Sequence, residues 1–216
     1  TEYGFEGKTR PYTLTANENI ATDLDNYGES SYSAASIGAM GASSLTIDCN
    51  SGAYSINGGS KGGITVASGQ TLTVQNVGSL DSEGAVVKSI NGFSTTGNGG
   101  VISNAGTLTV TDSVFSGNSE TVSGGAIYNT GATNISAVNA DTLFTGNSAN
   151  SVANDIHNTG TVNLNAGTYV EDETTKQRTI TLGGGISGTS GTININNHAT
   201  VYGGKVVFNG TTTGNT

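Results

Sequence analysis

Residues 93–130, FSTTGNGGVISNAGTLTVTDSVFSGNSETVSGGAIYNT, contain two copies of one short pattern. A GGxIxN turn that begins at Gly99 recurs at Gly124, and a turn that begins with Phe115 and ends in Gly-Asn recurs at Phe144, 29 residues later. Between these turns lie short alternating strands and no helical pattern. A period of roughly 20 to 50 residues built from strands and glycine turns is typical of a solenoid.

A four-residue alternating strand marks each repeat along the chain. Thr71-Leu72-Thr73-Val74 reads polar, apolar, polar, apolar, and similar tetrads begin at residues 44, 107, 161 and 192. A sixth copy, around Thr133-Asn134-Ile135, is expected to be slipped by one residue. Because successive side chains of a strand face opposite sides, one residue in two should point into the coil. The residues expected inward are Leu72, Val74, Leu108, Val162, Ile193 and, by the same alternation, Cys49.

Composition agrees with such a fold. Thirty-four glycines, one proline and 11% charged residues describe a chain rich in turns but without the proline and charge of a disordered segment. The hydrophobic content of 33% is low for a globular core. A solenoid needs few inward residues, because each coil is covered by its neighbours. The sequence therefore predicts an all-β protein, a parallel β-helix (β-solenoid) of about six to seven coils, with its repeats in residues 44–216.

Charge and cysteine content exclude several classes of function. The net charge of −9 and the pI near 4.4 argue against binding to nucleic acid or to an anionic membrane surface, which both need clustered Lys and Arg. No apolar run approaches the roughly 18 to 20 residues of a membrane-spanning helix, and no signal peptide is visible. Cys49 is the one cysteine, so no disulfide framework or cysteine metal cluster is indicated. Since the first residue is Thr1, a processed or excerpted chain is expected.

Residues 1–43 differ from the repeats, being more aromatic and more charged. One interpretation is an N-terminal cap or a set of aromatic-rich first coils that shield the end of the solenoid. The alternative is a contact platform, because tyrosine is favoured in protein and sugar contacts. The candidate aromatic contacts are Tyr3, Tyr12, Tyr27 and Tyr32.

The densest charge cluster of the chain is YVEDETTKQR at residues 169–178. A solvated loop or an insertion between two strands is the simpler interpretation. Loops on a rigid solenoid are also where such proteins place their contacts, so this segment is the first candidate interaction loop. Its charged residues are Glu171, Asp172, Glu173, Lys176 and Arg178.

The recurring asparagines, glycines and phenylalanines are expected to be structural. Asparagine tolerates the left-handed conformation, and amides at equal positions of successive coils can form a hydrogen-bonded ladder. Phe93, Phe115 and Phe144 are expected to stack in the same manner, with Asn98 closing its turn as Asn118 and Asn147 do. Further glycine turns are expected at Gly183 and Gly203. The turn residues are Gly99, Gly100, Asn104, Phe115, Asn118, Gly124, Gly125, Asn129, Phe144, Asn147 and Asn158.

The paired motifs GGxI and FxxN resemble the repeats of chlamydial polymorphic membrane proteins and related autotransporter passengers of Gram-negative bacteria. They occur as GGVI at 99, GGAI at 124, FSGN at 115 and FTGN at 144, and the resemblance covers roughly residues 62–206. It implies a right-handed parallel β-helix that is extracellular or on the cell surface of a Gram-negative bacterium. The implied function is non-enzymatic adhesion to a surface protein or glycan of a host or neighbouring cell. No cofactor is expected.

Asp112 and Asp141 carry the main alternative, a polysaccharide-degrading β-helix enzyme. They occupy equivalent repeat positions and are expected about one coil, or roughly 4.8 Å, apart, which would suit a carboxylate pair or a calcium ion. No Lys or Arg lies near either in the repeat, so turn capping is the favoured role. Outward threonines such as Thr71, Thr73, Thr107 and Thr109 raise ice binding as a further alternative, although Ser44, Asn163 and Asn194 interrupt the array.

The C-terminal residues 206–216 suggest self-assembly. They are expected to repeat the register of residues 93–98 and so to open another coil, whose unpaired edge could template a further strand. A glycine- and threonine-rich tail that is nevertheless ordered would need something to hold it. A second copy of the chain, stacked head to tail into a homopolymeric filament, is the expected partner.

Overall fold

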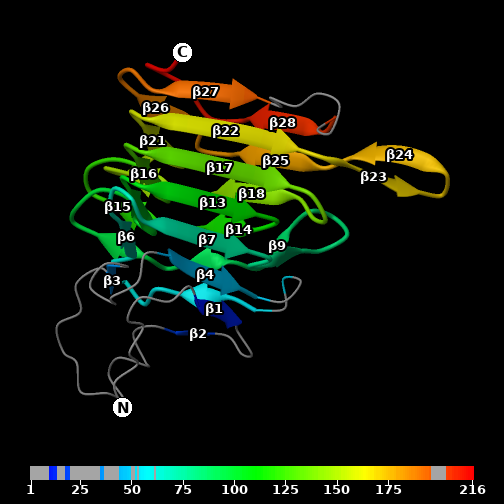
Figure 1. Cartoon of the computed structure of the whole chain (residues 1–216), viewed down its shortest axis with the longest axis horizontal. Helices are drawn as coiled ribbons and strands as arrows, with labels where there is room; N and C mark the ends of the chain where they lie inside the picture. The colour runs from blue at the N-terminus through cyan, green and yellow to red at the C-terminus, as the bar shows by residue number, and fades with distance from the viewer. Residues whose placement is uncertain are drawn as a thin grey trace.

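The computed structural model describes residues 10–13, 18–19, 35–36, 44–49, 52, 54–60, 62–195 and 203–216. These residues contain strands and turns and no helix. The chain visits three parallel sheets in turn and stacks one coil upon the next, so that the strands of each sheet follow one another along the axis (Figure 1). The predicted all-β parallel solenoid is confirmed.

Sheets 1 and 2 each hold seven parallel strands, and sheet 3 holds six. Sheet 1 runs β1 (Arg10–Thr13), β4 (Ser44–Asp48), β7 (Thr71–Gln75), β13 (Thr107–Thr111), β17 (Ala132–Ala137), β22 (Thr161–Ala166) and β27 (Thr192–Ile195). Sheet 2 runs β2 (Glu18–Asn19), β5 (Ile56–Asn57), β10 (Ile90–Asn91), β14 (Val114–Ser116), β18 (Thr142–Thr145), β25 (Thr179–Leu182) and β28 (Lys205–Phe208). Sheet 3 runs β3 (Ala35–Ser36), β6 (Ile64–Val66), β12 (Ile102–Asn104), β16 (Ile127–Asn129), β21 (Ile156–Asn158) and β26 (Ile186–Gly188).

Three smaller sheets complete the described strands. Between sheets 2 and 3, β11 (Ser94–Thr95), β15 (Ser119–Glu120) and β19 (Ser148–Ala149) pair in parallel, and β20 (Val152–Ala153) folds back on β19. Between sheets 1 and 2, two antiparallel hairpins leave the solenoid. They are formed by β8 (Ser79–Leu80) with β9 (Val86–Lys88), and by β23 (Thr168–Glu171) with β24 (Thr174–Gln177).

The core is a column of inward side chains. Leu72, Leu108 and Val162 lie in register on β7, β13 and β22 of sheet 1 and are fully buried, as the alternation predicts. Cys49 is also buried. At the last strand of this sheet the burial weakens: Ile193 is only half-buried, and Ile195 is 51% exposed.

The strand β17 corrects one sequence expectation. Leu108 pairs with Thr133, so the tetrad begins at Ala132 and is not slipped. Thr133 therefore occupies an inward position, where it is fully buried. Its hydroxyl donates to Oδ1 of Asn129 at 2.9 Å and accepts from Nδ2 of Asn104 at 3.2 Å, which satisfies the polar group inside the column. A one-residue slip would have turned Ile135 to solvent.

The phenylalanine stack is shorter than expected. The rings of Phe115 and Phe144 stack with centroids 4.7 Å apart and planes at 7°. The equivalent residue of the preceding coil is Ile90, which pairs with Phe115, and not Phe93. Phe93 lies three residues further along and is buried, with its N–H donating to Oδ1 of Asn118 at 3.2 Å. Asn98 is accordingly exposed and does not repeat the role of Asn118.

The predicted asparagine ladder is confirmed and extended. Nδ2 of Asn104 donates to Asn129 at 2.8 Å, Asn129 donates to Asn158 at 2.8 Å, and Asn158 donates to Asn215 at 3.0 Å. A second ladder joins Asn118 to Asn147 at 3.0 Å, and Asn147 to Asp155 at 2.8 Å. The ladders satisfy buried amides along the axis.

The paired glycines are required by the close approach of neighbouring coils. A Cβ on Gly100 would lie 2.1 Å from the carbonyl oxygen of Gly125, and one on Gly125 would lie 2.4 Å from the backbone nitrogen of Ser148. Gly99 and Gly124 have φ of 74° and 77°, in the left-handed region. These turn residues therefore have the structural role that the sequence predicts.

The C-terminal segment follows a different register from the one expected. Phe208 pairs with Leu182, which pairs with Phe144, so β28 continues sheet 2, and Gly203 precedes a sheet 2 strand instead of a sheet 3 turn. Residues 209–216 then bond to the preceding coil: Thr213 N–H donates to Ile186, and Thr216 N–H to Gly191. Bonds within the chain thus hold this tail, and a second copy is not needed to explain its order.

The described residues within 1–43 form three short strands that continue the sheets. The strands β1, β2 and β3 pair in parallel with β4, β5 and β6. Tyr12 belongs to β1, while Tyr3, Tyr27 and Tyr32 lie outside the described residues.

Candidate functional site at the corner between sheets 1 and 2

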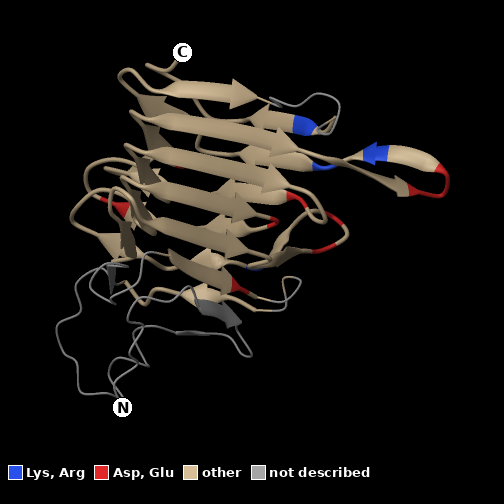
Figure 2. Cartoon of the chain, viewed as in Figure 1, with Lys and Arg blue, Asp and Glu red and all other residues tan. Residues whose placement is uncertain are grey.

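Charged residues gather at the corner where the chain passes from sheet 1 to sheet 2 (Figure 2). Of the charged residues from 44 onward whose side chains the structure describes, only Glu120 and Asp155 lie away from this corner. The corner carries Asp48, Asp81, Glu83, Lys88, Asp112, Asp141, Glu171, Asp172, Glu173, Lys176, Arg178 and Lys205.

The candidate interaction loop is a regular hairpin. Thr168 pairs with Gln177 and Glu171 with Thr174, which leaves Asp172 and Glu173 as a two-residue turn. Both turn residues have positive φ, 49° and 60°, as a type I′ turn requires. The hairpin β23–β24 projects well beyond the coils (Figure 1), and its tip carries the cluster of acidic residues (Figure 2).

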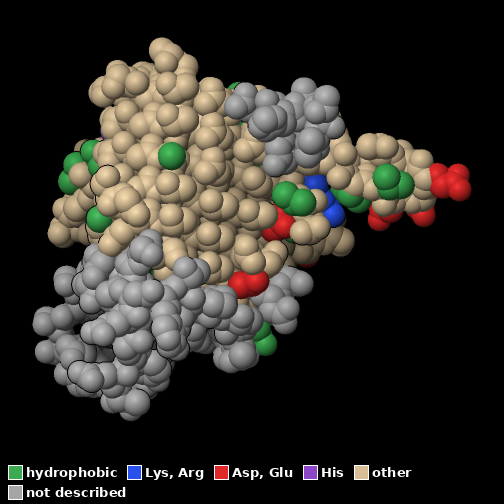
Figure 3. All heavy atoms as spheres, viewed as in Figure 1, with side chains coloured by type: hydrophobic (Ala, Val, Ile, Leu, Met, Phe, Trp, Pro, Cys, Tyr) green, Lys and Arg blue, Asp and Glu red, His purple; other side chains and the backbone are tan. Residues whose placement is uncertain are grey.

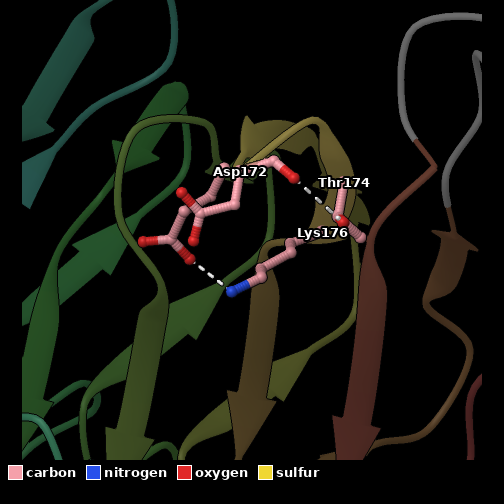
Figure 4. Close-up of polar contacts among 4 residues, drawn as sticks. Asp172, Thr174 and Lys176 are labelled. Atoms are coloured by element: carbon pink, nitrogen blue, oxygen red, sulfur yellow. Dashed lines mark hydrogen bonds and ion pairs between the residues drawn. The ribbon is translucent and has the colours of Figure 1, made fainter.

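Polar contacts stiffen this hairpin. Lys176 Nζ forms an ion pair with Glu171 Oε2, and the Thr174 hydroxyl donates to the Asp172 carbonyl at 3.3 Å (Figure 4). The hydrogen bond and charge of Lys176 lower the pKa of Glu171, and the same contacts with Glu171 raise the pKa of Lys176. Both side chains are exposed, so the pair contributes little to stability and mainly orders the charges.

Arg178 lies at the base of the hairpin. Its guanidinium carbon is 3.8 Å from the centroid of the Tyr169 ring, a cation–π geometry, and its backbone N–H donates to the carbonyl of Gly167 at 2.8 Å. Val170, on the other side of the same strand, is 73% exposed. Arg178 thus belongs to the wall of the solenoid, while Glu171–Lys176 belong to the projecting arm.

A groove of about 700 Å³ runs along the corner between the two hairpins. One end is formed by residues 79–82 and 84 of the β8–β9 hairpin, and the other by Arg178. Its side chains are mostly polar: Asn76, Ser79, Asp81, Ser82, Asp112, Asn139, Asp141 and Arg178, with Leu80, Val114 and Ala140 as the apolar contribution.

Asp112 and Asp141 both line this groove, and both cap backbone turns as expected. Asp112 is buried and accepts from the N–H groups of Val138, at 2.6 Å, and Asn139. Asp141 Oδ1 accepts from Thr179 N–H at 2.9 Å. No basic residue lies near either aspartate in the repeat, but Arg178, 37 residues beyond Asp141, lines the same groove. No cluster of three or more metal-ligating side chains occurs in the part of the chain that the structure describes.

Sequence reasoning did not find the groove, although a signal was present. Successive first positions of the sheet 1 tetrads lie 27, 36, 25, 29 and 31 residues apart, at 44, 71, 107, 132, 161 and 192. The two longest steps contain the two hairpins. Two long insertions at one corner, separated by short turns, indicate a walled groove.

The outer face of sheet 1 is flat and uncharged apart from its margin (Figure 3). From β4 to β27 its outward positions carry Thr, Ser, Asn and Gln, with Ala132 and Asp48 as exceptions. The threonine columns give way to an amide ladder in which Asn194 donates to Asn163, and Asn163 to Asn134. These amides bond to each other, so the regular threonine array is confined to part of the face.

Functional inference for this protein rests on its fold and on the charged corner between sheets 1 and 2. No protein family, curated protein sequence or solved structure matches this chain. Among the described residues, no helix has the length and apolar character needed to cross a membrane.

Proposed function

We propose that this β-solenoid is a secreted or surface-displayed scaffold of a Gram-negative bacterium that binds a partner on a host or neighbouring cell, without catalysing a reaction. The proposal is supported mainly by the hairpin β23–β24, which carries four charged residues between 171 and 176 on a projecting arm. A rigid framework with contacts on projecting segments is a common arrangement in binding proteins.

The chemistry of the two repeat aspartates favours binding over hydrolysis. General acid–base catalysis by a carboxylate pair needs oxygens that are free to exchange protons with a substrate. Asp112 uses both carboxylate oxygens, and Asp141 uses one, to cap backbone N–H groups. Stabilising these turns is therefore the role that their contacts support.

The decisive variant replaces residues 169–176 by Asn-Gly, so that Thr168 and Gln177 close a minimal type I′ hairpin. The solenoid strands are untouched, and thermal unfolding should change little. Beads coated with the purified protein should bind cultured epithelial cells and Gram-negative cells, and the variant should lose most of this binding.

A charge-exchange variant, Glu171→Lys with Lys176→Glu, serves as the matched control because it keeps composition and ion pair but exchanges the positions of the charges. Reduced adhesion in this variant would show that the charge arrangement is recognised. Full adhesion by the hairpin-replacement variant would refute the arm as the contact element.

A further inference from the structure

The corner groove results from uneven connections between sheets 1 and 2. The connections 112–113 and 138–141 are short, whereas 76–89 and 167–178 each contain a hairpin. Short turns thus form the floor and the longer insertions form the ends. The same corner of the solenoid supplies all four segments, so the groove has a fixed backbone frame.

Asp112 makes the floor rigid. Its φ of 51° turns the chain sharply from β13 to β14, and its buried carboxylate holds the N–H groups of Val138 and Asn139 from the next coil. The floor residues Asn139 and Ala140 are thereby fixed in place. Asn76, at the corresponding turn of the previous coil, also has positive φ, 56°, and lines the groove.

The groove offers hydrogen-bond acceptors at one end and on its floor, and donors at its other end. At the β8–β9 end Asp81 accepts from the N–H groups of Glu83 and Ala85 through Oδ1, and on the floor Asp141 accepts from Thr179 through Oδ1. No described bond uses Oδ2 of either residue. At the opposite end Arg178 is held over Tyr169, and its Nε is buried without a hydrogen-bond partner among the described residues.

We propose that this groove binds an oligosaccharide of neutral or amino sugars. This inference rests on the proposed function and names the partner class of the same corner. Sugar hydroxyls can donate to the carboxylates and accept from the guanidinium, and a groove of about 700 Å³ is within the ordinary range for ligand sites.

The groove chemistry disfavours other occupants. The groove contains three carboxylates and one guanidinium, and this excess of negative charge repels uronic acid and sulfated chains. A peptide would need apolar pockets or a free strand edge. The groove has only three apolar side chains, and only the ends of the sheet strands reach it. It therefore offers a peptide neither an apolar pocket nor a free strand edge.

The test uses the whole chain on an array of immobilised neutral, amino, uronic and sulfated oligosaccharides, followed by calorimetric titration of the best soluble binder. Asp81→Asn and Asp141→Asn retain Oδ1 for the backbone N–H groups, and they replace the free acceptor Oδ2 by an uncharged NH2 donor. Each should weaken binding about tenfold, since a charge-assisted hydrogen bond is lost. Glu83→Gln removes an exposed charge from the same hairpin as Asp81, but Glu83 does not line the groove, so the affinity of this variant should stay unchanged.

Three results would each overturn the inference: no binding on the array, binding confined to uronic or sulfated chains, or full affinity in both aspartate variants. Asp81 lies in an exposed hairpin, so its variant keeps the test valid if Asp141→Asn fails to fold. Cell adhesion that depends on the β23–β24 arm while the array stays empty would refute the groove and leave the proposed function standing.

Discussion

At the scale of single residues, the most unusual group is Asp155. It is fully buried, accepting from Asn147 Nδ2 at 2.8 Å and from Gly184 N–H at 2.7 Å. Desolvation outweighs these hydrogen bonds and raises the pKa of Asp155 to about 6. The folded protein therefore holds this proton more tightly than the unfolded chain, whose carboxyl has a pKa of 3.8.

This difference predicts a pH dependence of stability. The contribution of Asp155 is fully present below pH 3.8 and is lost as the pH rises through about 6, by up to about 3 kcal/mol. Asp155→Asn cannot ionise. Denaturant unfolding of both proteins should be measured from pH 4 to 7.5. The free energy of unfolding of the variant should increase relative to that of the parent as the pH rises. A difference that stays constant with pH would contradict this.

A second residue-scale prediction compares two asparagine ladders. Asn129 is buried and bonds to Asn104, Asn158 and Thr133, so Asn129→Ala leaves several buried polar groups unpaired. We expect a loss of about 2 to 4 kcal/mol in the free energy of unfolding. Asn163→Ala cuts a ladder of the same geometry on the solvent face and should cost below about 1 kcal/mol. Equal losses would show that burial is not the cause.

At the scale of elements, sequence patterns predicted strands well and register less well. Alternation placed Leu72, Leu108 and Val162 correctly, because an inward apolar column is a direct consequence of strand geometry. Alternation failed at β17, where a buried hydroxyl occupies an apolar position, and the turn motif failed at Phe93, because Ile90 is the residue that pairs with Phe115. The groove brings Asp112, Asp141 and Arg178 together through stacking, which local sequence does not encode. The right-handed winding stays a prediction.

The register of sheet 2 leads to a stabilising substitution. Ile90 occupies the position of Phe115 and Phe144 one coil earlier, and it borders an apolar cavity of about 80 Å³. Ile90→Phe should extend the ring stack and fill part of this space, adding about 1 kcal/mol to the unfolding free energy. Thermal unfolding measures the gain. Ile127→Phe, in a fully buried column that does not border this cavity, should destabilise by about 1 to 3 kcal/mol. Destabilisation by both would show that the cavity does not accept a ring.

At the scale of the whole molecule, stability depends on contacts between neighbouring coils. Leu108→Asp places an unpaired charge in the middle of the column, where the side chain is fully buried, and should cost several kcal/mol, at least about 3. Val206 is half-buried on the last described strand of sheet 2, so Val206→Asp should reduce the free energy of unfolding by less. Circular dichroism of the parent should show strand without helix. Equal losses in the two variants would contradict a chain of locally coupled coils.

The corner between sheets 1 and 2 has a consequence for how this protein can diversify. Added residues there leave the backbone ladders intact, as the β8–β9 and β23–β24 hairpins demonstrate. Elsewhere, glycines such as Gly100 and Gly125 lie so close to the next coil that even a methyl group would collide. The two longest connections between described strands of sheets 1 to 3 from β4 onward, 76–89 and 167–178, both lie at this edge. Residues inserted between Asp172 and Glu173 would lengthen or replace the arm while the framework stays the same.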